Sequence, residues 1–319
     1  MRAQQWDDIP AFMWQRSDWS WQTYAVAPTQ TQGFPGKHNT MLNEAPCADT
    51  DPATAEIAGK PRMKRMTDPG LQVHLLPVAS GREGESADLR PLLELLDTEE
   101  QARAARFRFA RDRQLYVQAH VLLRRVLSQH AEIAPQQWRF ERGRDGKPAL
   151  CRRHHPALRH LRFNLAHCQG MAAVIVAQGR EVGIDVEHLD AIDDPAELAA
   201  TILAPSEQTE WRRIGDDPIF RRQFLLTRWT LKEAALKATG SGLGRHAPDT
   251  LTFALDAHQR WTLHGPARLS ATGRLWRFVT TTLGPKPHPS LHLALAIEPR
   301  ENYPADGLPV DYFHHADPT

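Results

Sequence analysis

The chain has 319 residues, and its 39 lysines and arginines nearly balance 38 aspartates and glutamates, for a net charge of +1. This balance gives no reason to expect nucleic acid or another long polyanion as a partner. The 3 cysteines form no CxxC pair, which argues against a disulfide scaffold or a structural zinc site and fits a reducing compartment. No apolar run is long enough to span a membrane, and the N-terminus lacks the apolar core of a signal peptide, so we expect a cytoplasmic protein without membrane contact.

Residues 1–68 differ in composition from the rest of the chain. Tryptophans are interleaved with polar residues there, and a run rich in Thr, Gln, Pro and Ala leads to a basic segment at residues 60–65. Neither a helical nor a strand period is present, so these residues are predicted to be a mostly disordered extension. The alternative is that the tryptophans dock on another surface as an anchor.

Regular patterns begin near Leu71. Residues 71–77 and 161–167 are expected to be strands, and the latter ends in His167. The arginine-rich residues 99–112 run into an amphipathic helix over 113–130. Their guanidinium groups either face solvent or form an anion pocket, because the guanidinium fork suits phosphate. A strand near residues 138–141 precedes the turn-rich residues 142–148.

The next segment predicts a β-hairpin made of residues 171–177 and 181–187. Side chains alternate along a strand, so the residues numbered 182, 184 and 186, all apolar, share one face. Gly183, Asp185 and Glu187 share the other. Two carboxylates placed side by side repel each other unless a cation sits between them. The alternative is an exposed, solvated sheet face.

A helix is predicted over residues 219–239, with Gly240 as a left-handed C-cap. Glu233 falls on its apolar stripe, and Lys237 follows one turn later. They form either a solvated i,i+4 pair or part of a buried site, where a carboxylate needs a cation or several donors. Helices at 193–203 and 205–213 are expected before it. After it we expect strands at 250–255, 259–263, 275–281 and 291–297, and then a polar tail with loose histidines at 314 and 315.

Asp185, Glu187 and Glu233 are oxygen ligands without nearby Cys or His at zinc spacing. Such a set suits Mg²⁺, which usually shares its shell with substrate phosphates. The residues that could supply counter-charges for the phosphates are Lys232, Lys237, Lys147, His167 and Arg103. The residues therefore predict Mg²⁺-assisted phosphoryl chemistry on a small polyphosphate. A two-metal nuclease is the competing interpretation, and the neutral charge balance weakens it.

Two motifs together resemble the signature of 4′-phosphopantetheinyl transferases of the surfactin-synthetase-activating (Sfp) type. They are VGIDVE at residues 182–187 and WTLKEAALK at residues 229–237. GKP at 146–148, FNLAH at 163–167 and the basic residues 99–112 resemble upstream motifs of this family. The likeness covers roughly residues 70–300 and leaves the N-terminal extension unexplained.

The resemblance implies an α+β fold of two similar halves related by a pseudo-twofold, with coenzyme A between them. It implies transfer of 4′-phosphopantetheine from coenzyme A to a serine of an acyl or peptidyl carrier protein, releasing adenosine 3′,5′-bisphosphate. The halves are expected at residues 69–180 and 181–303, and the polar tail at 304–319. Because both halves lie in one chain, a monomer suffices.

The resemblance also assigns roles to particular residues. Asp185 and Glu233 would bind Mg²⁺ and Glu187 would complete the shell, while Glu233 would also be the base for the serine hydroxyl. Lys237 would steady the pyrophosphate, and Lys232 would contact phosphate or the partner. The residues implied to bind coenzyme A are Arg103, Lys147, Pro148, Ala166, His167 and Lys232, with Arg103 at the 3′-phosphate.

Ala166 departs from the family, which commonly has serine before the histidine. A hydroxyl contact to phosphate is thus replaced by a backbone N–H or absent, which bears on coenzyme A affinity more than on the reaction. Two other hypotheses stay open: a Mg²⁺-dependent nuclease or phosphatase, and a non-catalytic module that binds coenzyme A or a carrier protein.

Overall fold

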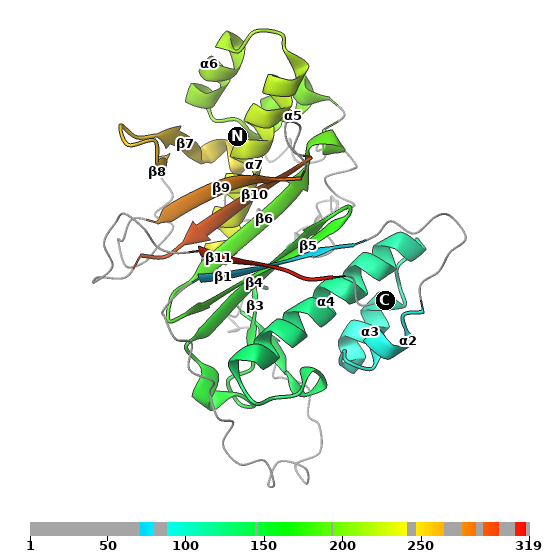
Figure 1. The fold of residues 1–319 in the computed structure, drawn as a ribbon. Coiled ribbons are helices and arrows are strands. Elements are labelled where there is room, and N and C mark those ends of the chain that lie inside the picture. The colour runs from blue at the N-terminus through cyan, green and yellow to red at the C-terminus, as the bar shows by residue number, and fades with distance from the viewer. Residues whose placement is uncertain are drawn as a thin grey trace, which may run out of the picture.

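A computed structural model of the chain describes residues 71–78, 88–143, 146–192, 194–240, 247–264, 276–284, 290–299 and 310–316 (Figure 1). The extension predicted at residues 1–68 lies outside the described residues. Two mixed layers of sheet and helix form the described part. Its strands are β1 (Leu71–Pro77), β2 (Phe140–Arg142), β3 (Pro148–Leu150), β4 (Leu161–Cys168), β5 (Met171–Gln178), β6 (Val182–His188), β7 (Thr252–Leu255), β8 (Trp261–His264), β9 (Arg277–Leu283), β10 (Leu291–Ile297) and β11 (Val310–His314). Its α-helices are α2 (Arg90–Leu93), α3 (Thr98–Ala104), α4 (Ala110–His130), α5 (Pro195–Ile202), α6 (Pro205–Arg213) and α7 (Pro218–Thr239).

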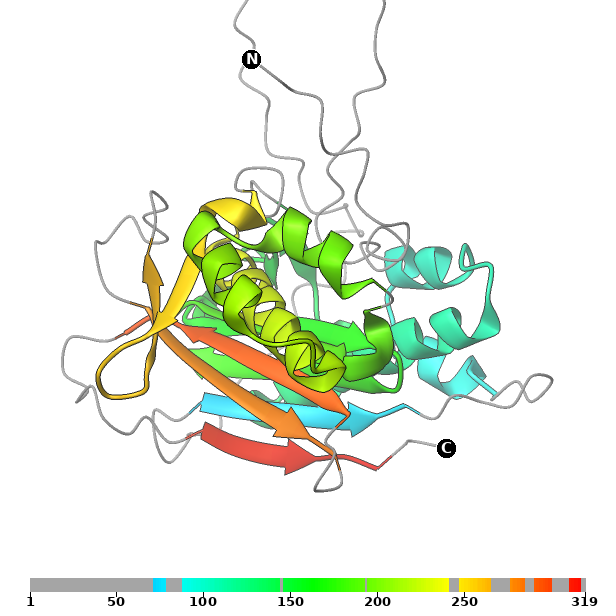
Figure 2. The same ribbon diagram turned by 90° about the horizontal axis from the view of Figure 1, so that it is seen from above.

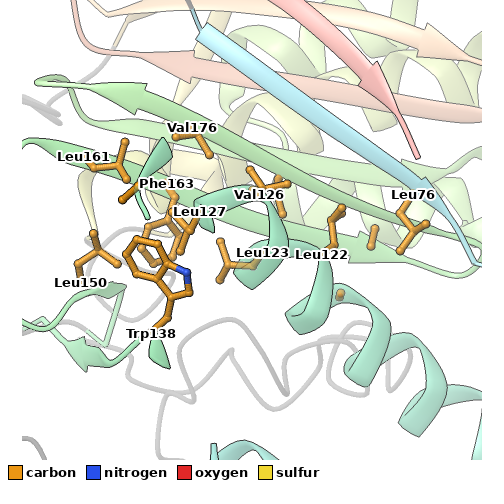
Figure 3. Close-up of a cluster of buried hydrophobic side chains, with 14 of the residues drawn as sticks. Leu76, Leu122, Leu123, Val126, Leu127, Trp138, Leu150, Leu161, Phe163 and Val176 are labelled. Carbon is orange, nitrogen blue, oxygen red and sulfur yellow. The ribbon is translucent and has the colours of Figure 1, made fainter. Parts of the chain in front are cut away.

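The first sheet has the strand order β11-β1-β5-β4, and α4 packs on one of its faces. Alternation along β5 explains this packing, because Val174 and Val176 point toward α4 while Ile175 points to the opposite face. Leu123 and Leu127 of α4 belong to the same buried cluster as these valines (Figure 3). The cluster also contains the side chain of Trp138, which precedes β2. The long helix is therefore held by the side-chain stripe that its sequence predicts.

The second sheet has the order β6-β10-β9-β8-β7, and α7 packs on it. Ala294 and Ala296 of β10 face α7, whereas Leu293 and Leu295 face away from it. Small side chains on the helix side let α7 approach the sheet closely. The helix is 22 residues long, and α4 of the first layer is 21 residues long.

The two sheets pack against each other through their remaining faces. Apolar side chains from β1, β4, β5, β6, β9 and β10 form this shared cluster. The edge strands β4 and β6 lie next to each other where the two sheets meet. There the Asn164 side-chain oxygen accepts a hydrogen bond from the Ile184 N–H at 2.9 Å. The expected α+β fold is confirmed, and the structure shows it as two helix-covered layers with α4 on one outside and α7 on the other (Figure 1).

The hairpin predicted over residues 171–187 is wrong. Strand β5 pairs with β1 and β4, whereas β6 pairs with β10, so the chain leaves one sheet and enters the other between residues 178 and 182. The alternation within β6 is as predicted: Val182, Ile184 and Val186 lie in the cluster between the sheets.

The polar tail predicted at residues 304–319 is also wrong in part. Residues 310–314 form β11, which pairs in parallel with β1 on the edge of the first sheet (Figure 2). His315, expected to be loose, lies with its Nε2 2.9 Å from Nδ1 of the buried His74. Within the described ranges, no helix has the length and apolar character needed to cross a membrane.

Candidate active site

Asp185 of β6 and Glu233 of α7 lie near each other where α7 packs on β6. Asp185 is 4% exposed and Glu233 is 6% exposed, so both carboxylates are buried. Gly183 explains the closeness of strand and helix: a Cβ there would lie 2.0 Å from the Ala234 carbonyl oxygen and 2.6 Å from the Ala238 nitrogen. The glycine therefore lets the backbone of α7 rest on the strand beside the acids.

Local sequence signals place α7 over the strand. Asp217 caps the helix by accepting hydrogen bonds from two backbone N–H groups, and Pro218 occupies the first helical position. Gly240 ends the helix with φ 75° and ψ 10°, the left-handed C-cap that the sequence predicts. Glu233 and Lys237 are one turn apart and belong to the same buried stretch.

Lys237 holds a central place among the acids. Its Nζ donates to Asp185 Oδ1 at 2.6 Å. Burial alone lowers the pKa of the Lys237 ammonium, but the carboxylates around it, Asp185 first and then Glu233 and Glu187, outweigh burial and raise that pKa above its ordinary value. The lysine is therefore firmly charged and balances the carboxylates.

Glu233 is less well compensated than Asp185. Burial is the main cause that raises the pKa of Glu233 to about 7; the nearby Asp185 raises it further, and Lys237 opposes both. Its Oε1 is buried without a hydrogen-bond partner. Buried carboxylate oxygens are normally satisfied by donors or by a cation, so this oxygen is available to a ligand. Near neutral pH the group can both release and accept a proton.

A divalent cation fits part of this arrangement. Asp185 and Glu233 offer hard oxygen atoms, and an unsatisfied Glu233 oxygen beside a second carboxylate is the environment that a Mg²⁺ ion neutralises. Among the residues that the structure describes, no group of three or more His, Cys, Asp or Glu side chains is assembled as a metal site. Two ligands therefore fit, and the third, Glu187, stays a prediction.

Sequence reasoning missed His292, which lies opposite Glu187 in the β6–β10 ladder. Directly opposed residues of antiparallel strands share a face, so His292 also faces α7. Its Nε2 is 3.0 Å from the Thr227 hydroxyl and its Nδ1 is 3.2 Å from the Thr230 hydroxyl, and burial lowers the pKa of the imidazole to about 4. A histidine within the apolar run of residues 291–297 was the available signal.

Two family models match the chain over most of its described length. Residues 181–296 match the 4′-phosphopantetheinyl transferase superfamily, and residues 83–180 match the N-terminal region of 4′-phosphopantetheinyl transferases. The 4′-phosphopantetheinyl transferase HetI of Nostoc is 32% identical over 185 residues, which are 58% of this chain and 76% of HetI. The chain belongs to the 4′-phosphopantetheinyl transferases. The resemblance inferred from its motifs is thereby confirmed.

Further similar proteins match a smaller part of this chain. A putative 4′-phosphopantetheinyl transferase of Synechocystis is 32% identical over 158 residues, which are 48% of this chain and 62% of that protein. Among solved structures, the holo-[acyl-carrier-protein] synthase of Thermotoga maritima matches with a TM-score of 0.29 and 26% identity, covering 37% of this chain and 62% of that one.

The lysine of the GKP motif does not lie open to a ligand in this transferase. Lys147 Nζ donates to Glu181 Oε2 at 2.9 Å, to the Val182 carbonyl at 3.1 Å and to the Ala238 carbonyl at 2.8 Å. Burial lowers the pKa of Lys147, although Glu181 opposes this. The expectation that its ammonium binds a phosphate of coenzyme A does not fit these contacts, because all three of its protons are already donated.

Lys232 is placed even deeper in the fold. It is fully buried, and its Nζ donates to Glu207 Oε2 and to the Ile202 carbonyl, each at 2.5 Å. Glu207 in turn accepts from the backbone N–H groups of Ala204 and Phe253 at 2.9 Å. Lys232 thus ties α7 to α6 and β7, and the expected contact with phosphate or a partner does not fit a side chain without exposed surface.

The remaining residues of the predicted set lie on the first layer. Ala166 is 3% exposed in the cluster between the sheets, so its side chain packs in the core. The next residue, His167, is half-buried on the same strand, and Pro148 is half-buried at the start of β3. Arg103 is half-buried on α3, where its charge acts on Tyr116 and His120 of α4. The roles of these residues toward coenzyme A stay predictions.

Proposed function

We propose that this transferase moves the 4′-phosphopantetheine arm of coenzyme A to a serine hydroxyl of an acyl or peptidyl carrier protein and releases adenosine 3′,5′-bisphosphate. The observation that carries the proposal is the buried Glu233 with a pKa near 7, beside Asp185 and Lys237, in a member of this family. A general base is most effective when its pKa lies near the working pH.

We infer that Asp185 and Glu233 hold a Mg²⁺ ion together with the pyrophosphate, and that Glu187 completes the shell. When bound, the ion would neutralise pyrophosphate charge and stabilise the leaving bisphosphate. The support from this chain is the oxygen-only donor set and the buried Glu233 Oε1 without a partner. His292, positioned by two threonine hydroxyls beside Glu187, would line the floor of this site.

Glu233 would take the serine proton, directly or through a water molecule, as the serine oxygen attacks the phosphorus next to pantetheine. A new bond forms between this phosphorus and the serine oxygen. The bond from the same phosphorus to the bridging pyrophosphate oxygen breaks, and its electron pair leaves with adenosine 3′,5′-bisphosphate. Lys237, charged and held by Asp185, would offset the negative charge that develops on the pyrophosphate.

The test is mass spectrometry of an apo carrier protein incubated with the transferase, coenzyme A and Mg²⁺. The expected result is a gain of one phosphopantetheine mass on the carrier serine, lost in excess chelator and with a serine-to-alanine carrier. Phosphate release from nucleotides without any carrier would instead support the phosphatase or nuclease hypothesis. Coenzyme A binding without transfer would support the non-catalytic module.

We further propose that the transferase acts as a monomer in the cytoplasm. Both helix-covered layers come from one chain, and strand and helix of the same layer supply the acids. Light scattering in solution tests the first point, because a dimer mass at working concentration would contradict it.

A further inference from the structure

We propose that Lys147 is a positioning residue, which fixes α7 against β6 from the opposite layer and thereby sets the distance between the helix-borne and strand-borne acids. The kinetic part of its test rests on the proposed transfer reaction. The structural part does not, so the two can fail separately.

The acceptors of Lys147 identify what it holds. Val182 is the first residue of β6 and lies three residues before Asp185, while Ala238 follows Lys237 in the last turn of α7. One ammonium donates to the carbonyls of both, at 3.1 Å and 2.8 Å. A cation at a helix C-terminus satisfies carbonyls that have no partner within the helix. Lys147 therefore connects the two elements that carry the acids.

The connection lies where strand and helix are closest. Gly183, next to Val182, leaves no room for a Cβ against the helix backbone at Ala234 and Ala238. Two backbones in such close contact leave no side chain between them that could adjust. If the hydrogen bonds of Lys147 to Val182 and Ala238 were lost, we therefore expect the distance between the acids to change.

Glu181 connects Lys147 to residues of both layers. Its carboxylate accepts from Lys147 at 2.9 Å and from Arg162 Nε of β4 at 2.6 Å. Its backbone N–H donates to Glu298 Oε2 at 3.0 Å, and its carbonyl accepts from the Glu298 N–H at 3.0 Å. Glu181 thus holds the β2–β3 connection, β4 and the end of β10 together at the entry to β6.

The backbone next to Lys147 holds this lysine in position before β3. Gly146 has φ 83°, a conformation that favours glycine, and the Gly143 N–H donates to the Lys147 carbonyl at 3.0 Å. At the other side, a Cβ built on Gly240 would lie 3.6 Å from the Lys147 Cβ. The first layer therefore reaches over and contacts the end of α7 through Lys147.

A phosphate role for this ammonium would require that Glu181 be displaced and two carbonyls lose a donor. A phosphate and the Glu181 carboxylate are both anions and would compete for one buried cation. This competition provides a test, because the two roles predict different effects of neutralising Glu181 on kcat, on Tm and on the affinity for coenzyme A.

The test compares Glu181→Gln and Lys147→Arg with the wild-type protein in coenzyme A titrations, thermal unfolding and steady-state transfer. For a positioning role, we expect both variants to lower kcat by at least about tenfold, because small displacements of reacting groups are costly. KM for coenzyme A should stay within about threefold, and Tm should fall by several degrees. Arginine cannot place its planar fork in a pocket shaped for three acceptors around one nitrogen.

A phosphate role predicts the reverse. Glu181→Gln would then tighten coenzyme A binding without lowering kcat or Tm, because a competing anion is removed. Lys147→Arg would keep kcat within about threefold of the wild-type value, because a guanidinium serves phosphate well. Unchanged kcat and Tm in Glu181→Gln would overturn the proposal.

A measurement on the wild-type protein keeps the proposal testable if a variant does not fold. The protein is treated with an amine-reactive reagent, and the peptide containing Lys147 is followed by mass spectrometry. A positioning lysine stays unlabelled with or without coenzyme A and reacts after unfolding in urea. A lysine that reacts in the folded protein and is protected by coenzyme A would overturn the proposal, whether or not the protein modifies a carrier.

Discussion

Replacing Glu233 with glutamine should stabilise the metal-free protein strongly at pH 8 and by less than about 1 kcal/mol at pH 5. Burial, with Asp185 adding to it, raises the pKa of Glu233 from 4.5 to about 7. The unfolded chain releases this proton near pH 4.5, whereas the folded protein retains it until about pH 7. The stabilising contribution of the group is therefore complete below pH 4.5 and is lost as the pH rises through 7.

The magnitude follows from the size of this shift. A pKa raised from 4.5 to about 7 corresponds, at roughly 1.4 kcal/mol per unit, to about 3 kcal/mol of destabilisation above pH 7. Glutamine has the shape of the protonated side chain without its charge and escapes this cost. For a domain of this size, the gain corresponds to a Tm increase of roughly 6–12 °C.

The assay is thermal and urea unfolding of wild-type and Glu233→Gln protein in excess chelator at pH 5 and pH 8. The exposed Glu132→Gln is the matched control and should change stability by less than about 0.5 kcal/mol at either pH. If Glu233→Gln were no more stable than wild type at pH 8, the carboxylate would be well compensated in the fold, and the reasoning from its burial would be refuted.

Adding Mg²⁺ at pH 8 should offset the stability advantage of Glu233→Gln over the wild-type protein. An ion bound by Asp185 and Glu233 stabilises the wild-type protein by about 3 kcal/mol at a hundred times its dissociation constant. The glutamine variant lacks the charged ligand and should gain much less. Equal gains in both proteins would show that Mg²⁺ binds elsewhere, whatever the activity of the variant.

Three further predictions concern the surroundings of this site. Gly183→Ala should lower the free energy of unfolding by at least about 2 kcal/mol in urea titrations, because its Cβ would lie 2.0 Å from the Ala234 carbonyl oxygen. Asp185→Asn removes the charged partner of Lys237 and should slow carrier modification at least about 100-fold in a mass-spectrometric time course while circular dichroism stays unchanged; a near wild-type rate would contradict the assigned role. Deleting residues 310–319 uncovers the edge of β1 and should lower Tm and raise light scattering on heating, and a variant as stable and clear as wild type would show that β11 contributes little.

Local rules were sufficient for the elements that carry the acids. Helical periodicity and Gly240 predicted α7, and side-chain alternation predicted which residues of β6 share a face. That one face packs between the sheets and the other lies against α7 is seen only in the structure. The pairing of β6 with β10 could not be predicted in this way, because its partners are about a hundred residues apart and nothing local distinguishes them from the adjacent β5. For this reason the predicted pairing of residues 181–187 with residues 171–177 as a hairpin is wrong.

The lysines show a different limit. Sequence motifs identify Lys147, Lys232 and Lys237 as cations near a polyphosphate site, but they do not reveal how deep each side chain lies or which acceptor it meets. Glu207, which binds Lys232, comes from a helix 25 residues earlier, and Glu181 approaches Lys147 from the neighbouring layer. Lys237 alone of the three contacts one of the predicted acids within the described residues.

The parallel pairing of β11 with β1 has a consequence for biosynthesis. Residues 310–314 leave the ribosome after every other described element, yet they complete the sheet to which the earliest described strand belongs. The first sheet therefore cannot be completed until residues 310–314 have left the ribosome, and β1 lacks this partner until then. A gene split between the two layers would separate partners that need each other, so co-expressed fragments should recover the folded protein only if the second fragment carries this late strand.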